Sequence, residues 1–138
     1  RQLGLAPDGR IALAERDSGG GYQIAVRGTD GSVKLITALS GANYDAAWSP
    51  NGETIAFVSN NSGDEEIYAI SPDGQNLRQL TNSPRFDKHP SWSPDGSKIV
   101  FYSTRTGKRQ LWIMNADGSN PTPLTGSTVE EFDPVWVR

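Results

Sequence analysis

Apolar residues recur along this chain in short runs, each bounded by Gly, Asp, Asn or Pro. The clearest runs are Thr54–Ser59 (TIAFVS), Ser97–Thr104 (SKIVFYST) and Gln110–Met114 (QLWIM). Val, Ile, Phe, Tyr and Trp between such breakers indicate short strands joined by tight turns. No window carries a helical stripe longer than a turn or two, because Pro and Gly interrupt the chain too often. The pattern therefore predicts an all-β fold.

One tetrapeptide recurs between the predicted strands. SPDG occurs at Ser71–Gly74 and Ser93–Gly96, and APDG, SPNG, NADG and GTDG are close variants elsewhere in the chain. Ser or Asn suits the first position of a type I turn, Pro presets φ at the second, and Gly is favoured at the fourth. Asp before Gly also hydrogen-bonds to nearby backbone. Each copy is therefore predicted to be a tight reversal.

The chain repeats itself with a period of about 44 residues. Trp48, Trp92 and Trp136 are each 44 residues apart, and Phe57 is carried to Phe101 by the same offset. An offset of 43 maps the first unit onto the second. The chain is therefore predicted to be one domain, 1–138, made of three copies of one unit. The approximate repeats are 5–47, 48–91 and 92–135, with 128–138 as a closing inner strand.

Each unit is long enough for four short strands, which are clearest in the third. They are predicted at Asp87–Ser93, Lys98–Thr104, Gln110–Asn115 and Thr122–Thr125. SPDG joins the first of these strands to the second, and its near-copy NADG joins the third to the fourth. Four antiparallel strands in a unit of about forty residues are typical of a β-propeller blade.

The repeat resembles the TolB-type propeller repeat, a relative of the WD-repeat propellers. Residues 90–125 carry almost the whole pattern, as WSPDG, KIVFYSTR, LWIMNADG and PLT, and residues 48–81 match it well. The first unit departs from the pattern, with Leu5 in place of Trp and Ala6 in place of Ser. The resemblance covers essentially the whole chain and implies a six-bladed propeller. The three units are therefore predicted to form half of it.

The resemblance implies that the inner strand of each blade ends in Trp-Ser-Pro and that its indole packs between neighbouring blades. The residues expected to pack between blades are Trp48, Trp92, Trp136, Trp112 and Tyr68.

Three blades do not close a ring, because propellers have four to eight. Two inter-blade faces would stay bare, and such apolar faces are interaction surfaces or aggregation hazards. The chain ends in TVEEFDPVWVR, which reads as a complete inner strand, whereas the first unit has lost most of its own. Two chains that exchange Glu131–Val137 would form six blades with two-fold symmetry. The sequence therefore predicts a homodimer or a fragment of a longer six-bladed chain.

The composition of the chain excludes several classes of partner. The formal charge of −3 and the pI near 5.1 argue against a nucleic-acid or anionic-membrane partner. No apolar run is long enough to span a bilayer, and the N-terminus has no apolar signal core, so a mature chain, a fragment or a cytosolic protein is expected.

The residues needed for catalysis are scarce, because the chain has one His, no Cys and no G-x-S-x-G motif. It is therefore predicted to be non-enzymatic and to need no cofactor or metal.

Ionisable side chains precede the three tryptophans of the 44-residue repeat by three or five positions. His89 stands where the neighbouring repeats have Asp45 and Asp133, and Asp87 is likewise equivalent to Glu131. If side chains alternate along this strand, those on one face could point into the central channel. One reading is a site for a polar ligand or a metal, and the other is a solvated channel mouth. The second is favoured, since the spacing matches no metal motif.

Two loops of adjacent repeats carry opposite charge. Asp64–Glu66 is acidic and Lys108–Gln110 is basic. Both are expected to lie exposed on one rim, where an ion pair contributes roughly 0–1 kcal/mol.

The favoured function is a TolB-like binding or scaffold module whose partners are itself and a protein or peptide ligand. By resemblance such propellers work in the bacterial periplasm or at the cell surface. The alternative is the propeller part of an enzyme, either a gate of a prolyl-oligopeptidase-like peptidase or a metal-dependent lyase of uronic-acid polysaccharides. A peptidase needs a hydrolase domain that this sequence lacks. A lyase needs a His-rich channel, whereas this chain has one His.

Overall fold

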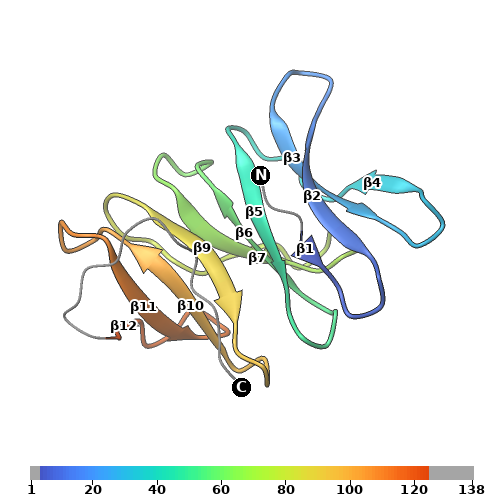
Figure 1. Cartoon of the computed structure of the whole chain (residues 1–138). Coiled ribbons are helices and arrows are strands. Elements are labelled where there is room, and N and C mark those ends of the chain that lie inside the picture. The colour runs from blue at the N-terminus through green and yellow to red at the C-terminus, as the bar shows by residue number, and fades with distance from the viewer. Residues whose placement is uncertain (1–3, 125–138) are drawn as a thin grey trace.

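The structure, a computed structural model, describes residues 4–124 as three four-stranded antiparallel sheets that lie side by side (Figure 1). Blade 1 contains β1 (Gly4–Leu5), β2 (Ile11–Arg16), β3 (Tyr22–Arg27) and β4 (Val33–Leu35). Blade 2 contains β5 (Asn43–Trp48), β6 (Ile55–Ser59), β7 (Glu66–Ile70) and β8 (Arg78–Gln79). Blade 3 contains β9 (Asp87–Trp92), β10 (Lys98–Ser103), β11 (Gln110–Asn115) and β12 (Thr122–Pro123).

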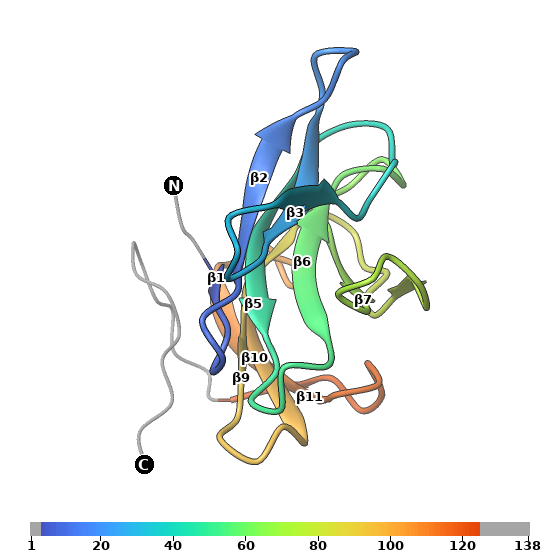
Figure 2. The same cartoon turned by 90° about the vertical axis from the view of Figure 1, so that its right-hand side faces the viewer.

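The prediction of an all-β chain with three propeller blades is confirmed. In each sheet the strands pair in chain order, from the inner first strand to the outer fourth strand. The four strands predicted for the third repeat are present, and β12 ends two residues before the predicted end. Figure 2 shows the inner strands β1, β5 and β9 along one edge of the molecule. The first strands of the three blades are therefore neighbours along this edge.

The predicted tight turns are present between the strands. In the two SPDG copies, the amide of Gly74 or Gly96 donates a hydrogen bond of 2.9 Å to the carbonyl three residues earlier. Both glycines have positive φ, 91° and 77°. A side chain is strained in this conformation, so the repeated Gly is required by the backbone.

The core lies between the blades rather than within any one of them. We call the contact between blades 1 and 2 seam 1–2, and that between blades 2 and 3 seam 2–3. Side chains alternate along β6, so that Ile55 and Phe57 face seam 1–2 while Ala56 faces seam 2–3. Side chains of one blade therefore meet those of the blade before it, both small ones such as Ala12 and large ones such as Ile24 in seam 1–2.

Two indoles tie neighbouring inner strands together. Trp48 Nε1 donates to the carbonyl of Gly4 at 3.0 Å, and Trp92 Nε1 donates to the carbonyl of Ala47 at 3.0 Å. Tyr68 packs in seam 1–2 and Trp112 packs in seam 2–3. Trp136 and the closing strand at 128–138 lie outside the described residues.

Candidate functional site

The inner strands β5 and β9 carry two kinds of side chain. Their first halves are polar, with Tyr44 and Asp45 on β5 and Lys88 and His89 on β9. Their last residues are Trp48 and Trp92, each followed by Ser-Pro. The inner strands lie along the same edge (Figure 2), with the polar halves of β5 and β9 in contact and their Trp-Ser-Pro corners lining one pocket.

A β-bulge interrupts each of these strands at the same repeat position. Asp45 and His89 have left-handed backbone angles, with φ of 57° and 58°, which is uncommon for residues other than Gly. The register with the second strand shifts at both places. A bulge inserts an extra residue and re-aims the side chains around it. The alternation assumed from the sequence is therefore broken at these two residues.

The bulges bring Asp45 and His89 together across the two blades. His89 Nδ1 lies 3.2 Å from Asp45 Oδ2, and the two side chains are 33% and 14% exposed. The His89 ring also packs edge-to-face on Tyr102, with the ring centroids 5.7 Å apart. Asp133, the third residue of the expected set, lies outside the described residues. The structure thus unites two of the three equivalent residues in a partly exposed His–Asp contact.

A second polar contact lies beside this pair and was not found from the sequence. The Tyr44 hydroxyl donates to Glu65 Oε2, and Lys88 Nζ lies 3.5 Å from the same oxygen. Burial, and then the hydrogen bond to Glu65, raise the pKa of Tyr44 well above its ordinary value. The phenol therefore stays neutral and acts as a hydrogen-bond donor.

The Asp87 side chain does not lie on the channel face, where strand alternation predicted it. Its side chain is fully buried in seam 2–3, 0% exposed, rather than on the channel face with His89. Ser83 Oγ donates to it at 2.6 Å, and Arg105 Nη2 lies 3.4 Å from its other oxygen. The bulge at His89 separates the two side chains that a regular strand would keep on one face. Glu131, the repeat equivalent of Asp87, lies outside the described residues.

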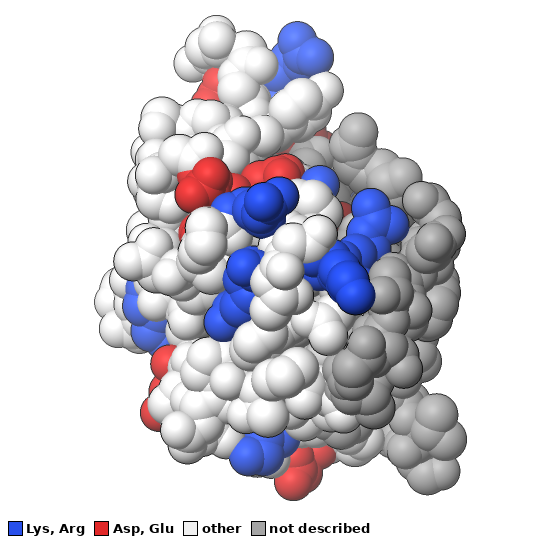
Figure 3. Space-filling model, turned by 90° about the vertical axis from the view of Figure 1, so that its left-hand side faces the viewer, with Lys and Arg blue, Asp and Glu red and all other residues white. Residues whose placement is uncertain are grey.

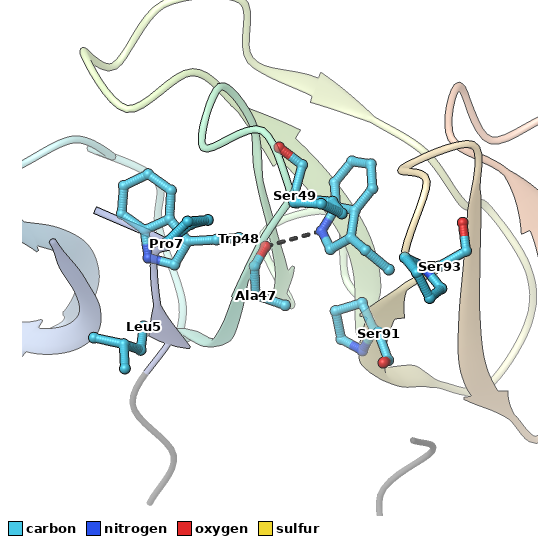
Figure 4. A pocket seen from close by; sticks show the side chains of 11 residues that line it. Leu5, Pro7, Ala47, Trp48, Ser49, Ser91 and Ser93 are labelled. Carbon is cyan, nitrogen blue, oxygen red and sulfur yellow. Dashed lines mark hydrogen bonds between the residues drawn. The ribbon is translucent and has the colours of Figure 1, made fainter. Parts of the chain in front are cut away.

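A pocket of about 340 Å³ lies at the Trp-Ser-Pro end of the inner strands (Figure 4). We call it the Trp-Pro pocket. All three blades contribute to its wall, and none of its eleven lining residues has an ionisable side chain. These residues are Leu5, Pro7, Ala47, Trp48, Ser49, Pro50, Pro90, Ser91, Trp92, Ser93 and Pro94. Sequence reasoning assigned the prolines to turns and the tryptophans to packing, so it did not recognise their shared pocket.

Turn contacts already use much of the hydrogen-bonding capacity of this pocket. Ser49 Oγ donates to Asn51 Oδ1 at 2.6 Å, and Ser93 Oγ donates to Asp95 Oδ1 at 2.7 Å. The carbonyl of Ala47 accepts the Trp92 indole N–H, drawn as a dashed line in Figure 4. The wall is therefore made of rings and small uncharged side chains, which suits binding of an uncharged segment better than proton transfer.

The face at the blade 3 end of the molecule is charged. Figure 3 shows Lys and Arg side chains gathered near its centre, with Asp and Glu beside them.

Within residues 4–124, no three His, Cys, Asp or Glu side chains are grouped so as to hold a metal ion. The same residues include no helix that could cross a membrane.

We compared the chain with families and with proteins of known structure. The family model described as TolB beta propeller domain (PD40) matches residues 5–138. A search of curated proteins finds no significant match.

Three solved structures illustrate the likeness. A protein described as TolB from Agrobacterium tumefaciens is 30% identical, with a TM-score of 0.83 over 91% of this chain and 46% of that chain. TolB from Acinetobacter baumannii is 23% identical, with a TM-score of 0.79 over 94% of this chain and 33% of that chain. An oligogalacturonate lyase in complex with manganese is 18% identical, with a TM-score of 0.67 over 91% of this chain and 41% of that chain. This chain therefore spans less than half the length of each, and the last two likenesses show the fold alone.

Proposed function

Because the chain belongs to the TolB beta-propeller family, we propose that it is a non-catalytic module that binds a protein or peptide segment in the Trp-Pro pocket. The observation that carries this proposal is the pocket wall, in which none of the eleven residues is ionisable. A site without a titratable group offers neither a general acid nor a general base. The enzyme alternative rests on fold likeness alone, and fold does not specify function.

The uncharged wall favours an extended peptide without charged side chains as the ligand. Aromatic side chains and prolines form rigid apolar surfaces that bind with little loss of side-chain entropy. A volume of about 340 Å³ lies at the lower end of the range for ligand pockets. It suits a few side chains of a peptide better than a large cofactor. By family membership, we propose that this binding occurs in the periplasm or at the cell surface.

A peptide library displayed on phage tests the proposal directly. Selected peptides are synthesised and titrated while the Trp fluorescence is followed, because Trp48 and Trp92 line the pocket. Pro94→Lys puts a long cation at the exposed pocket rim and is expected to weaken binding at least tenfold. Pro72→Lys is the matched control, because Pro72 holds the same place in an SPDG turn and does not line the pocket. Equal affinity of the two variants would refute the pocket as the binding site.

We further propose that the chain closes its ring by pairing with a second copy. Leu5 (71%), Val33 (53%) and Leu35 (42%) are exposed on blade 1. By strand pairing they lie on the face that points away from blade 2. In blade 2 the corresponding face packs against blade 1, so its Trp48, at the repeat position of Leu5, is buried. Two copies could cover this face of blade 1 with the far face of the partner's blade 3, giving six blades. The exchanged segment Glu131–Val137 lies outside the described residues.

The mass in solution decides between the assembly states. Light scattering after size exclusion, over a range of concentrations, is expected to give the mass of two chains. Leu35→Glu is expected to shift the protein towards one chain, while Leu77→Glu, at an equally exposed leucine of blade 2, leaves the mass unchanged. A single-chain mass at all concentrations would refute the dimer.

A further inference from the structure

Each seam contains a buried polar contact at the same repeat positions. In seam 1–2, Thr37 Oγ1 donates to Gln23 Oε1 at 2.5 Å and accepts the backbone N–H of Ile24 at 2.9 Å. From the next blade, Asn43 Nδ2 donates to the carbonyl of Tyr22 at 2.9 Å and approaches Gln23 Oε1 at 3.3 Å. Gln23, Thr37 and Asn43 are all buried. Neutral amides therefore join blade 1 to blade 2.

Seam 2–3 has the same contact with acids in place of the amides. Thr81 Oγ1 donates to Glu66 Oε1 at 2.6 Å and accepts the backbone N–H of Ile67 at 2.8 Å. Ser83 lies between the two acids: its N–H donates to Glu66 at 3.0 Å, and its hydroxyl donates to Asp87 at 2.6 Å. By repeat offset, Glu66 corresponds to Gln23 and Asp87 to Asn43.

The charges in seam 2–3 do not balance when both acids are ionised. Glu66 is 1% exposed and Asp87 is 0% exposed. Among the residues that the structure describes, Arg105 is the cation in contact with the pair, and its Nη2 lies 3.4 Å from Asp87 Oδ1. Two carboxylates beside one guanidinium leave a net negative charge out of water, which is unfavourable. Burial, and then the hydrogen bond to Asp87, raise the pKa of Glu66 to about 7.

The other charged groups of these strands are engaged in contacts of their own. On β7 and the turn before it, Glu65 is paired with Lys88 of β9 and accepts the Tyr44 hydroxyl. His89 of β9 is paired with Asp45 of β5. Within residues 4–124, neither contact supplies a second cation to Glu66, so a proton on Glu66 removes the excess negative charge.

We propose that seam 2–3 is a proton-dependent latch, in which Glu66 holds a proton and is hydrogen-bonded to Asp87 while blade 3 is fully docked on blade 2. Loss of this proton places two adjacent carboxylates in the seam and loosens it. Because the folded pKa lies above the ordinary value of 4.5, the contribution of Glu66 is fully favourable below pH 4.5. It is lost as the pH rises through about 7. The amides of seam 1–2 do not titrate, so the stability of that seam does not change over this pH range.

Amide hydrogen exchange of the full chain, followed residue by residue with NMR, tests the latch. The Asp87 N–H donates across the seam to the carbonyl of Glu65 at 2.8 Å, so its exchange reports opening of seam 2–3. The Ile67 amide lies in the same seam, and Ile24 is its matched control in seam 1–2. After correction for base catalysis, protection of Asp87 and Ile67 is expected to fall at least about tenfold between pH 5.5 and 8.5. Protection of Ile24 is expected to stay constant.

Glu66→Gln removes the titrating acid and is expected to abolish this fall, raising protection of Asp87 at pH 8.5. The double variant Glu66→Gln/Asp87→Asn reproduces the amide pair of seam 1–2 and serves if the single variant folds poorly. Protection that does not change with pH in the wild type would overturn the latch. An identical fall in the variants, or a carboxyl ¹³C titration of Glu66 with a midpoint below pH 5, would overturn it as well.

Discussion

Blades 1 and 2 are copies of one repeat, yet they are buried to different extents. Every residue of β6 and β7 in blade 2 is buried, whereas β2 in blade 1 has a single buried residue, Ala12. Leu13 pairs with Ala25 in blade 1 as Phe57 pairs with Tyr68 in blade 2, so the two residues hold the same place in the sheets. Phe57 is 0% exposed, whereas Leu13 is only partly buried. Phe57 faces blade 1, but the corresponding face of blade 1 has no described neighbour. The burial of a propeller strand is therefore decided by the adjacent blade.

The same difference is visible in the glycines of the outer turns. A Cβ on Gly118 would lie 2.5 Å from the carbonyl oxygen of Leu80, and one on Gly74 would lie 3.2 Å from that of Ile36. A Cβ on Gly31, the equivalent residue of blade 1, would meet no atom within 4 Å. The turns of blades 2 and 3 pack on the preceding blade, and the turn of blade 1 does not.

The largest expected effect comes from truncating the matched pair Phe57 and Leu13. Phe57→Ala should cost about 3–5 kcal/mol of unfolding free energy, because it leaves a cavity in a seam that is buried on both sides. Leu13→Ala should cost about 1 kcal/mol, since its side chain is already partly in water. Chemical denaturation measures both. Equal costs would show that another blade covers the outer face of blade 1 in solution.

An intermediate effect is expected for the turn glycines. Gly31→Ala and Gly118→Ala both place a side chain at positive φ, 87° and 89°, so both carry the same backbone strain. Gly118→Ala must in addition displace the carbonyl of Leu80, which should cost about 1–3 kcal/mol more. The difference in unfolding free energy between the two variants isolates turn docking. If they are equally destabilised, the turn of blade 3 does not pack on blade 2.

The smallest effect concerns the turns that follow the inner strands. The backbone N–H of Ser97, and then the hydroxyls of Ser93 and Ser97, lower the pKa of Asp95 to about 2. Because the folded pKa is depressed, the stabilisation is present above pH 3.8 and is lost as the pH falls through about 2. The turn of blade 2 has Asn51 at this position and cannot titrate.

Thermal unfolding of the wild type and of Asp95→Asn at pH 6 and pH 2 measures this loss. The variant is expected to match the wild type at pH 6, as the SPNG turn of blade 2 suggests, and to lose less of its midpoint temperature at pH 2. A variant that loses as much as the wild type would exclude Asp95 as the source of acid sensitivity.

Local rules predicted the strands and turns of this protein well. The strand runs of the third repeat and the SPDG turns lie where periodicity and turn chemistry place them, since both depend on residues close in sequence. The site was predicted less well. Asp87 was expected on the channel face and is buried in seam 2–3, because the bulge at His89 breaks the alternation. Glu66 was expected in an exposed acidic loop, yet it begins β7 and is 1% exposed because blade 3 covers it.

The sequence by itself determined the repeat, the four-stranded unit and the TolB-type family, because turn residues and β-branched runs specify structure over a few neighbours. Only the tertiary structure decided which copies are buried on two faces, which carboxyls meet in a seam and which prolines and tryptophans share a pocket. These properties arise where two blades touch. A residue identical in every repeat thus acquires a different environment in each blade.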